Sequence, residues 1–166
     1  MFSNGRLSEY ASLLQRNPNA YAVIRGSRTY HQIRGSVRFY QTASGVLVAA
    51  EVAGLPAPRG RCEAPVFGFH IHEGSTCSGD DTDPFADALT HYDPQQCPHP
   101  YHAGDLPPLF GVRGYAVSIF LTGRFSVREI VGKTVIIHSM PDDFTTQPAG
   151  NAGTKIACGE IRDARS

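Results

Sequence analysis

The chain has 166 residues, of which 41% are hydrophobic, and its 15 basic residues balance its 15 acidic ones. This length suggests one domain, and this hydrophobic content argues against a disordered chain. The neutral balance gives no sign of a nucleic-acid partner. No apolar run of about 18 residues could span a membrane, and the start MFSNGRLSEY has no signal-peptide core. We therefore expect a cytoplasmic protein with no membrane partner, unless another route exports it.

The first nineteen residues differ in pattern from the rest of the chain. Apolar residues recur at helical spacing over residues 7–16, and Asn17-Pro18 then ends the predicted helix. We therefore divide the chain into an N-terminal extension at 1–19, partly helical, and a domain at 20–166.

The domain consists of short predicted strands separated by turn-rich segments. The strands are predicted at 20–26, 33–40, 45–52, 65–73, 105–111, 114–121, 133–138 and 155–161. Many short strands between Gly- and Pro-rich turns are typical of an all-β sandwich or barrel. Two long polar loops, at 74–108 and 139–154, interrupt this pattern. Loops of this length in a compact domain are usually functional or disordered, and the histidines of the first loop favour a function.

Six of the seven histidines suggest a metal site. Two lie two residues apart in one predicted strand and so share a face, three lie in the first long loop ahead of an aspartate, and one ends a strand. The set is His70, His72, His91, His99, His102, His138 and Asp105. Imidazole suits copper and zinc, and a carboxylate can complete a zinc site. Seven ligands are the number that two four-coordinate ions need when one imidazole bridges them. The set therefore indicates a dinuclear copper–zinc centre, although on counts alone a set of unrelated loop histidines stays open.

The four cysteines indicate less. Cys62, Cys77, Cys97 and Cys158 form no C-x-x-C pair, so a cysteine-based zinc site has weak support. Reduced thiols are the usual state in the cytoplasm. The spacing leaves all three disulfide pairings open.

Five segments in one order resemble the signature segments of the copper–zinc superoxide dismutases. They are GFHIHEG at 68–74, HYDP at 91–94, HAGDLPPL at 102–109, KTVIIH at 133–138 and GNAGTKIACGEI at 150–161. The resemblance extends from about residue 20 to residue 162. It implies an all-β fold, an eight-stranded antiparallel Greek-key barrel with two long functional loops, to which this chain adds its short helical extension. It also implies an enzyme that converts two superoxide anions to dioxygen and hydrogen peroxide.

The resemblance implies a role for each residue of the predicted centre. The copper ligands would be His70, His72, His91 and His138, and the zinc ligands His91, His99, His102 and Asp105. His91 would bridge the two ions and carry a proton during catalysis. His99 lies closer to His102 in sequence than is usual in the family.

The resemblance also assigns residues outside the two ligand sets. Asp142 matches a carboxylate that links His70 to His99 and fixes their ring orientation, with Asp143 as the alternative. Cys77 and Cys158 match the disulfide within the family's subunit. Cys62 and Cys97 have no counterpart, and we expect them to be free thiols rather than a second bridge.

One position departs from the family pattern. Lys155 stands where the family carries an arginine at the mouth of the copper site. Lysine keeps the charge but lacks the planar fork of donors. We expect activity below that of an arginine version, with a steering of superoxide that weakens with salt.

Two further expectations concern function and assembly. The alternative function is a catalytically silent relative that binds copper or zinc for a structural or metal-handling role. Silent relatives usually lack a copper ligand, whereas all four candidates are present here. A homodimer is a possible assembly.

Overall fold

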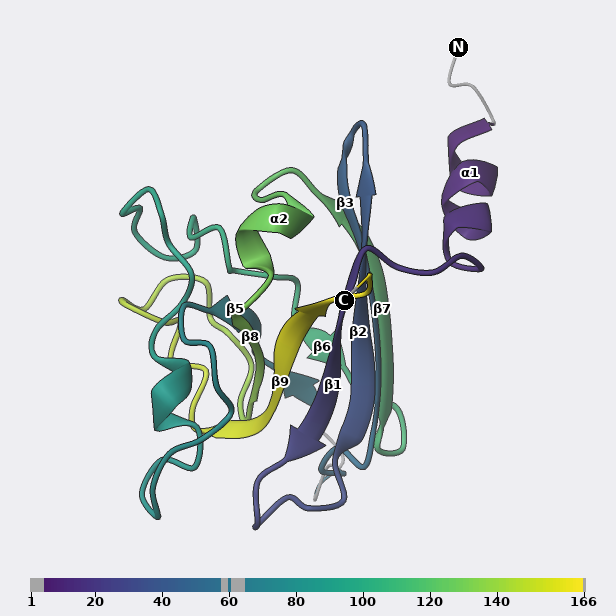
Figure 1. Ribbon diagram of the computed structural model, residues 1–166. Coiled ribbons are helices and arrows are strands. Elements are labelled where there is room, and N and C mark those ends of the chain that lie inside the picture. The colour runs from purple at the N-terminus through teal and green to yellow at the C-terminus, as the bar shows by residue number, and fades with distance from the viewer. Residues whose placement is uncertain (1–4, 58–59, 61–64, 166) are drawn as a thin grey trace.

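The computed structural model describes residues 5–57, 60 and 65–165, and structural statements refer to these residues. Cys62 lies outside them, whereas Cys97 is a free thiol, as predicted. The elements in chain order are α1 (Gly5–Leu13), β1 (Ala20–Gly26), β2 (Arg34–Thr42), β3 (Gly45–Ala53), β4 (Val66–Phe67), β5 (Phe69–His72), the 3-10 helix η1 (Ala86–Ala88), β6 (Leu109–Phe110), β7 (Tyr115–Thr122), α2 (Val127–Ile130), β8 (Thr134–His138) and β9 (Lys155–Asp163) (Figure 1).

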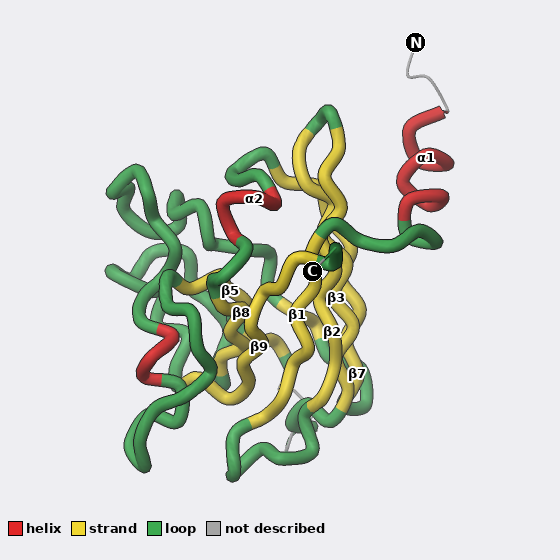
Figure 2. The backbone as a smooth tube through the Cα atoms, viewed as in Figure 1, coloured by secondary structure: helices red, strands yellow, loops and turns green. Residues whose placement is uncertain are grey.

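Seven strands form one antiparallel sheet in the order β5-β8-β9-β1-β2-β3-β7, and β4 pairs with β6 beside it. Figure 2 shows the sheet curled into a half-barrel, with the long loops gathered at the β5 and β8 end. The connection through α2 carries the chain from β7, at one end of the sheet, to β8 near the other. This arrangement confirms the predicted all-β class.

Two predicted strands are shorter than expected. The strand predicted at 65–73 is divided at Gly68, which lies between β4 and β5. The Gly68 N–H donates to the Met140 carbonyl at 2.8 Å, and its carbonyl accepts from the His138 N–H at 2.8 Å, so this residue bonds to the end of β8 and the second loop. The strand predicted at 105–111 is reduced to β6, because Pro107 and Pro108 have no N–H to donate to a ladder.

The inward side chains of the strands form the core. Phe69 and Ile71 are fully buried in it, and so are Val37 and Phe39 of β2. Since side chains alternate along a strand, burial of Phe69 and Ile71 turns His70 and His72 away from the core, toward the loops.

Helix α1 lies against the outer face of the sheet. Tyr10, Leu13 and Leu14 pack on a small cluster formed by Tyr40, Leu47 and Ala49 of β2 and β3. The helix ends at Leu13 rather than at residue 16. The division into an extension and a domain stays a prediction.

No helix among the described residues is long and apolar enough to cross a membrane.

Backbone hydrogen bonds fasten the first long loop to β5. The Tyr92 N–H donates to the Ile71 carbonyl at 2.8 Å, and the Ile71 N–H donates to the Gly104 carbonyl at 2.9 Å. Arg124 adds a side-chain clamp, since its Nη1 donates to the carbonyls of His102 at 3.1 Å and Asp105 at 3.2 Å. The loop histidines are therefore carried on a backbone held to the sheet.

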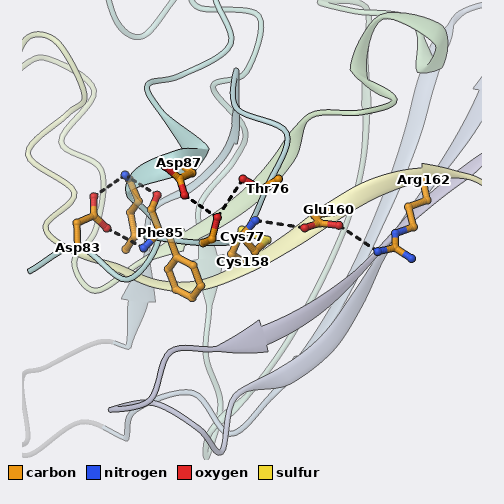
Figure 3. Close-up of a disulfide and its surroundings, with 10 residues drawn as sticks. Thr76, Cys77, Asp83, Phe85, Asp87, Cys158, Glu160 and Arg162 are labelled. Carbon is orange, nitrogen blue, oxygen red and sulfur yellow. Dashed lines mark hydrogen bonds and ion pairs between the residues drawn. A yellow bond between two sulfur atoms is a disulfide. The ribbon is translucent and has the colours of Figure 1, made fainter. Parts of the chain in front are cut away.

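A disulfide joins the start of the same loop to β9. Cys77 and Cys158 are bonded, with their Cα atoms 5.7 Å apart (Figure 3). The Cys77 N–H also donates to Glu160 Oε1 at 3.3 Å. The pairing implied by the resemblance is therefore the one present in the structure.

Candidate metal centre

The seven predicted ligands come together in two buried groups that share His91. The first group is His70, His72, His91 and His138, and the second is His91, His99, His102 and Asp105. Within each group, one ligand-type atom from every residue lies within 4.8 Å of the others. The two groups and the shared imidazole match the dinuclear arrangement that the ligand count indicated.

In the first group, the hydrogen bonds of the rings determine which nitrogen faces the centre. His72 Nδ1 lies 2.8 Å from the Leu89 carbonyl, and His138 Nδ1 lies 3.2 Å from the Gly153 carbonyl. A carbonyl only accepts, so in each neutral ring the proton is on Nδ1 and the lone pair is on Nε2. These two Nε2 atoms face each other at 3.3 Å. Two lone pairs repel at this distance, and a cation bound by both removes the repulsion.

The other two rings of the first group present unpaired nitrogens as well. His70 Nε2 lies 2.7 Å from Asp142 Oδ2, so His70 donates through Nε2 and keeps its lone pair on Nδ1. Among the described residues, neither His70 Nδ1 nor His91 Nε2, both buried, has a hydrogen-bond partner. Buried polar atoms are rarely left unpaired. The four rings therefore present four nitrogens that receive no hydrogen bond, and such a set fits a copper ion.

The second group shows the same pattern around a carboxylate. His99 Nε2 lies 2.9 Å from Asp142 Oδ1, which places the proton of His99 on Nε2. Its bare Nδ1 then faces Asp105 Oδ2 at 3.0 Å, so two acceptors oppose each other. His91 Nδ1 lies 2.8 Å from Asp105 Oδ1 and 3.4 Å from His102 Nδ1. Three imidazole nitrogens and one carboxylate fit a tetrahedral zinc site.

Asp142 connects the two groups, because one oxygen reaches His70 and the other reaches His99. Asp143, the alternative in the sequence, instead accepts from the N–H groups of Thr145 and Thr146. Gly150, at φ +65°, makes room for this link, since a Cβ there would lie 2.0 Å from Asp142 Oδ1. Only glycine fits this close approach without movement.

Burial and neighbouring rings keep His70, His72 and His138 neutral, because they lower the pKa of each. Burial lowers the pKa of His72 well below 6.5, and repulsion from His138 lowers it further. Burial likewise lowers the pKa of His138 from 6.5 to about 3. Burial works to raise the pKa of Asp142, but hydrogen bonds, beginning with that from His70, outweigh it and lower the value to about 2. Neutral imidazoles are the form that binds a metal ion.

We predict that the metal-free protein loses stability as the pH falls below 6.5. The folded-state pKa values of His70, His72 and His138 are lowered from 6.5, so on acidification the unfolded chain binds protons that the folded chain does not. Their contribution is present above pH 6.5 and is lost as the pH falls toward the folded value, about 3 for His138. Urea unfolding between about pH 8 and pH 4 measures this. A constant free energy of unfolding across that range would contradict it.

Sequence reasoning did not identify several residues that hold these ligands. Leu89 and Gly153 act through backbone carbonyls, which no side-chain pattern reveals. Arg124, whose guanidinium clamps the loop carbonyls, stands as an isolated arginine in sequence. Gly150 lies within a recognised segment, but only its φ and its contact with Asp142 show why it is glycine.

A cavity of about 580 Å³ leads to the first group, and His72, His91 and His138 are part of its wall. Lys155 lines the cavity too, together with Asp83 and Asp93. Its Nζ lies 2.7 Å from Asp83 Oδ2 and donates to the Phe85 carbonyl at 3.0 Å. Lys155, the predicted docking cation, therefore lines the cavity, and its ammonium is paired there with the Asp83 carboxylate.

Comparisons with known proteins agree with this geometry. A family model described as copper/zinc superoxide dismutase matches residues 33–161. Superoxide dismutase (Cu-Zn) 2 of Aquifex aeolicus is 35% identical over 137 residues, which cover 74% of this chain and 75% of that protein. The Cu-Zn superoxide dismutase of Deinococcus radiodurans is 34% identical over 139 residues, covering 73% of this chain and 72% of that protein.

A solved structure shows the same fold. The Cu/Zn superoxide dismutase from Brucella abortus superposes with a TM-score of 0.69 at 22% identity, covering 85% of this chain and 98% of that one. This likeness confirms the predicted fold class. Since the family model covers most of the chain and the relatives exceed 30% identity, this protein belongs to the copper/zinc superoxide dismutase family.

Proposed function

We propose that the protein is a superoxide dismutase that converts two superoxide anions to dioxygen and hydrogen peroxide. The observation that carries this proposal is the opposed pair of nitrogens at the end of the cavity. His72 Nε2 and His138 Nε2 face each other at 3.3 Å without a proton to share. His91 Nε2, which is buried and unpartnered, belongs to the same group. A cation bound by these three nitrogens would lie at the end of the cavity, where a small anion can reach it.

The proposed ligand atoms follow from the hydrogen bonds. Copper would be held by His70 Nδ1 and by the Nε2 atoms of His72, His91 and His138. Zinc would be held by the Nδ1 atoms of His91, His99 and His102 and by Asp105. When bound, copper supplies one-electron oxidation and reduction, and zinc supplies a fixed positive charge beside His91.

The protein's own residues bind and orient the substrate and deliver a proton. The Lys155 ammonium attracts and docks the anion at the cavity. His91 Nε2 carries a proton to the departing peroxide, while the Nδ1 of the same ring, which lies 2.8 Å from Asp105 Oδ1, would hold zinc together with that carboxylate. Asp142 keeps the rings of His70 and His99 in the orientation that directs their lone pairs inward.

The test is metal loading followed by an assay. After reconstitution with copper and zinc, we expect one ion of each per chain and rapid dismutation of superoxide, measured by pulse radiolysis or stopped flow. Stoichiometric copper without activity would support the silent, metal-handling alternative. The complete set of donor atoms and the cavity that reaches them favour the enzyme.

The cellular setting is a separate part of the proposal. A cytoplasmic location and a homodimer both remain predictions. Fractionation of cells that produce the chain tests the first. Light scattering of the metal-loaded protein tests the second.

A further inference from the structure

We propose that Asp83 is a built-in counter-ion of Lys155, which competes with superoxide for the ammonium and so limits how strongly the site attracts anions. This inference rests on the proposed function, because Lys155 is the docking cation of that function. It adds a residue of the first long loop that the metal centre does not use.

The contacts of Lys155 leave it little capacity for an anion. An ammonium has three N–H donors. One points to Asp83 Oδ2 at 2.7 Å and another to the Phe85 carbonyl at 3.0 Å. The lysine side chain is 15% exposed, and that of Asp83 is 39% exposed. One donor therefore remains for a substrate, on an ammonium whose charge is already paired.

The structure holds Asp83 in place for this pairing. Its second oxygen, Oδ1, accepts from the Phe85 N–H at 3.0 Å. Phe85 is itself buried against Ala88 and Ile136 in a small cluster that includes Cys158. Figure 3 shows Asp83 and Phe85 on the loop that Cys77 ties to β9. Because both partners are anchored, the pair forms with less loss of side-chain entropy than a typical surface pair.

The few charges along the cavity make the Lys155–Asp83 pair important for the attraction of an anion. Among the described residues that line it, the charged side chains other than histidines are Lys155, Asp83 and Asp93. A lysine paired at 2.7 Å acts on a distant anion as a dipole, whose attraction falls off faster than that of a single charge. Removing the charge of Asp83 should therefore strengthen long-range attraction of superoxide.

Asp83→Asn is the informative variant, because its carbonyl oxygen can still accept from the Phe85 N–H while the negative charge is lost. In the copper- and zinc-loaded protein, we expect azide to bind roughly threefold more tightly, as measured by titration of the visible copper absorption. We also expect kcat/KM for superoxide to rise roughly threefold at low ionic strength and to fall more steeply with added salt.

Asp81→Asn is the matched control. Asp81 is exposed in the same loop and does not line the cavity to the metal centre, so the variant changes net charge equally without removing the pair. Its azide affinity and salt dependence should match those of the parent. A second test repeats Asp83→Asn in a Lys155→Met background, where the gain in azide affinity should disappear because the ammonium is absent.

Several results would overturn the proposal. They are an azide affinity that is unchanged or weaker in Asp83→Asn, an equal gain in Asp81→Asn, or a gain that persists without Lys155. If Asp83→Asn lost its fold or its metals, Asp83→Ser, which also keeps an acceptor, would be put through the same titration. Because azide binding requires no turnover, the titration tests the counter-ion even if the loaded protein fails to dismutate superoxide.

Discussion

Changing His138 to alanine should weaken copper binding by more than about 100-fold and abolish dismutation. Loss of partners behind metal ligands typically costs about 10- to 100-fold in affinity, and loss of a ligand should cost more. Here the change removes the nitrogen that faces His72 Nε2 at 3.3 Å. Competition with a copper chelator measures the affinity, and a superoxide assay measures the activity.

The matched control is His31→Ala, since His31 is exposed and lies outside both ligand groups. This variant should bind copper and turn over like the parent. The metal-free His138→Ala protein should keep the near-UV circular dichroism of the parent, because the ring mainly faces other histidines and not the apolar core. Full activity in His138→Ala would contradict its assignment as a ligand.

Replacing both Cys77 and Cys158 by serine should lower the free energy of unfolding by several kcal/mol. The bond spans a sequence separation of 81, for which chain-entropy theory gives about 4.5 kcal/mol at 25 °C. The loss arises because the unfolded chain without the bond has more conformations. Urea unfolding of the metal-free proteins, compared at equal pH, measures the difference in the free energy of unfolding.

Cys97→Ser is the control for that experiment, because Cys97 is a free thiol. It should change the free energy of unfolding by less than about 0.5 kcal/mol. A double serine variant as stable as this control would show that the bond does not restrict the unfolded chain. Chemical reduction of the parent should reproduce the effect of the double variant.

Local sequence patterns were enough to predict the class of fold and the set of seven residues that the structure brings together in two groups. Strand alternation placed Phe69 and Ile71 in the core and His70 and His72 on the opposite face, and the structure agrees. This works because the two-residue repeat of a strand is a property of the backbone. Ligand chemistry worked for the same kind of reason, since imidazole and carboxylate carry their preference for copper and zinc in any fold.

The shortened strands show where local patterns failed. Gly68 lies in an apolar run that reads as one strand, yet its hydrogen bonds go to Met140 and His138, more than sixty positions along the chain. No window around Gly68 contains those partners. The break in the strand is consequently a tertiary effect.

The sequence by itself determined that this chain would form strands, gather six histidines and an aspartate, and resemble one family. Only the tertiary structure decided which nitrogen of each ring faces a metal ion, because Leu89 and Asp142, 17 and 72 positions from their histidines, fix the ring protons. The pairing of Lys155 with Asp83, also 72 positions apart, is likewise decided only by the tertiary structure. Composition and spacing determine which groups are available, whereas hydrogen bonds and ion pairs between distant segments determine how each group is protonated, oriented and charged.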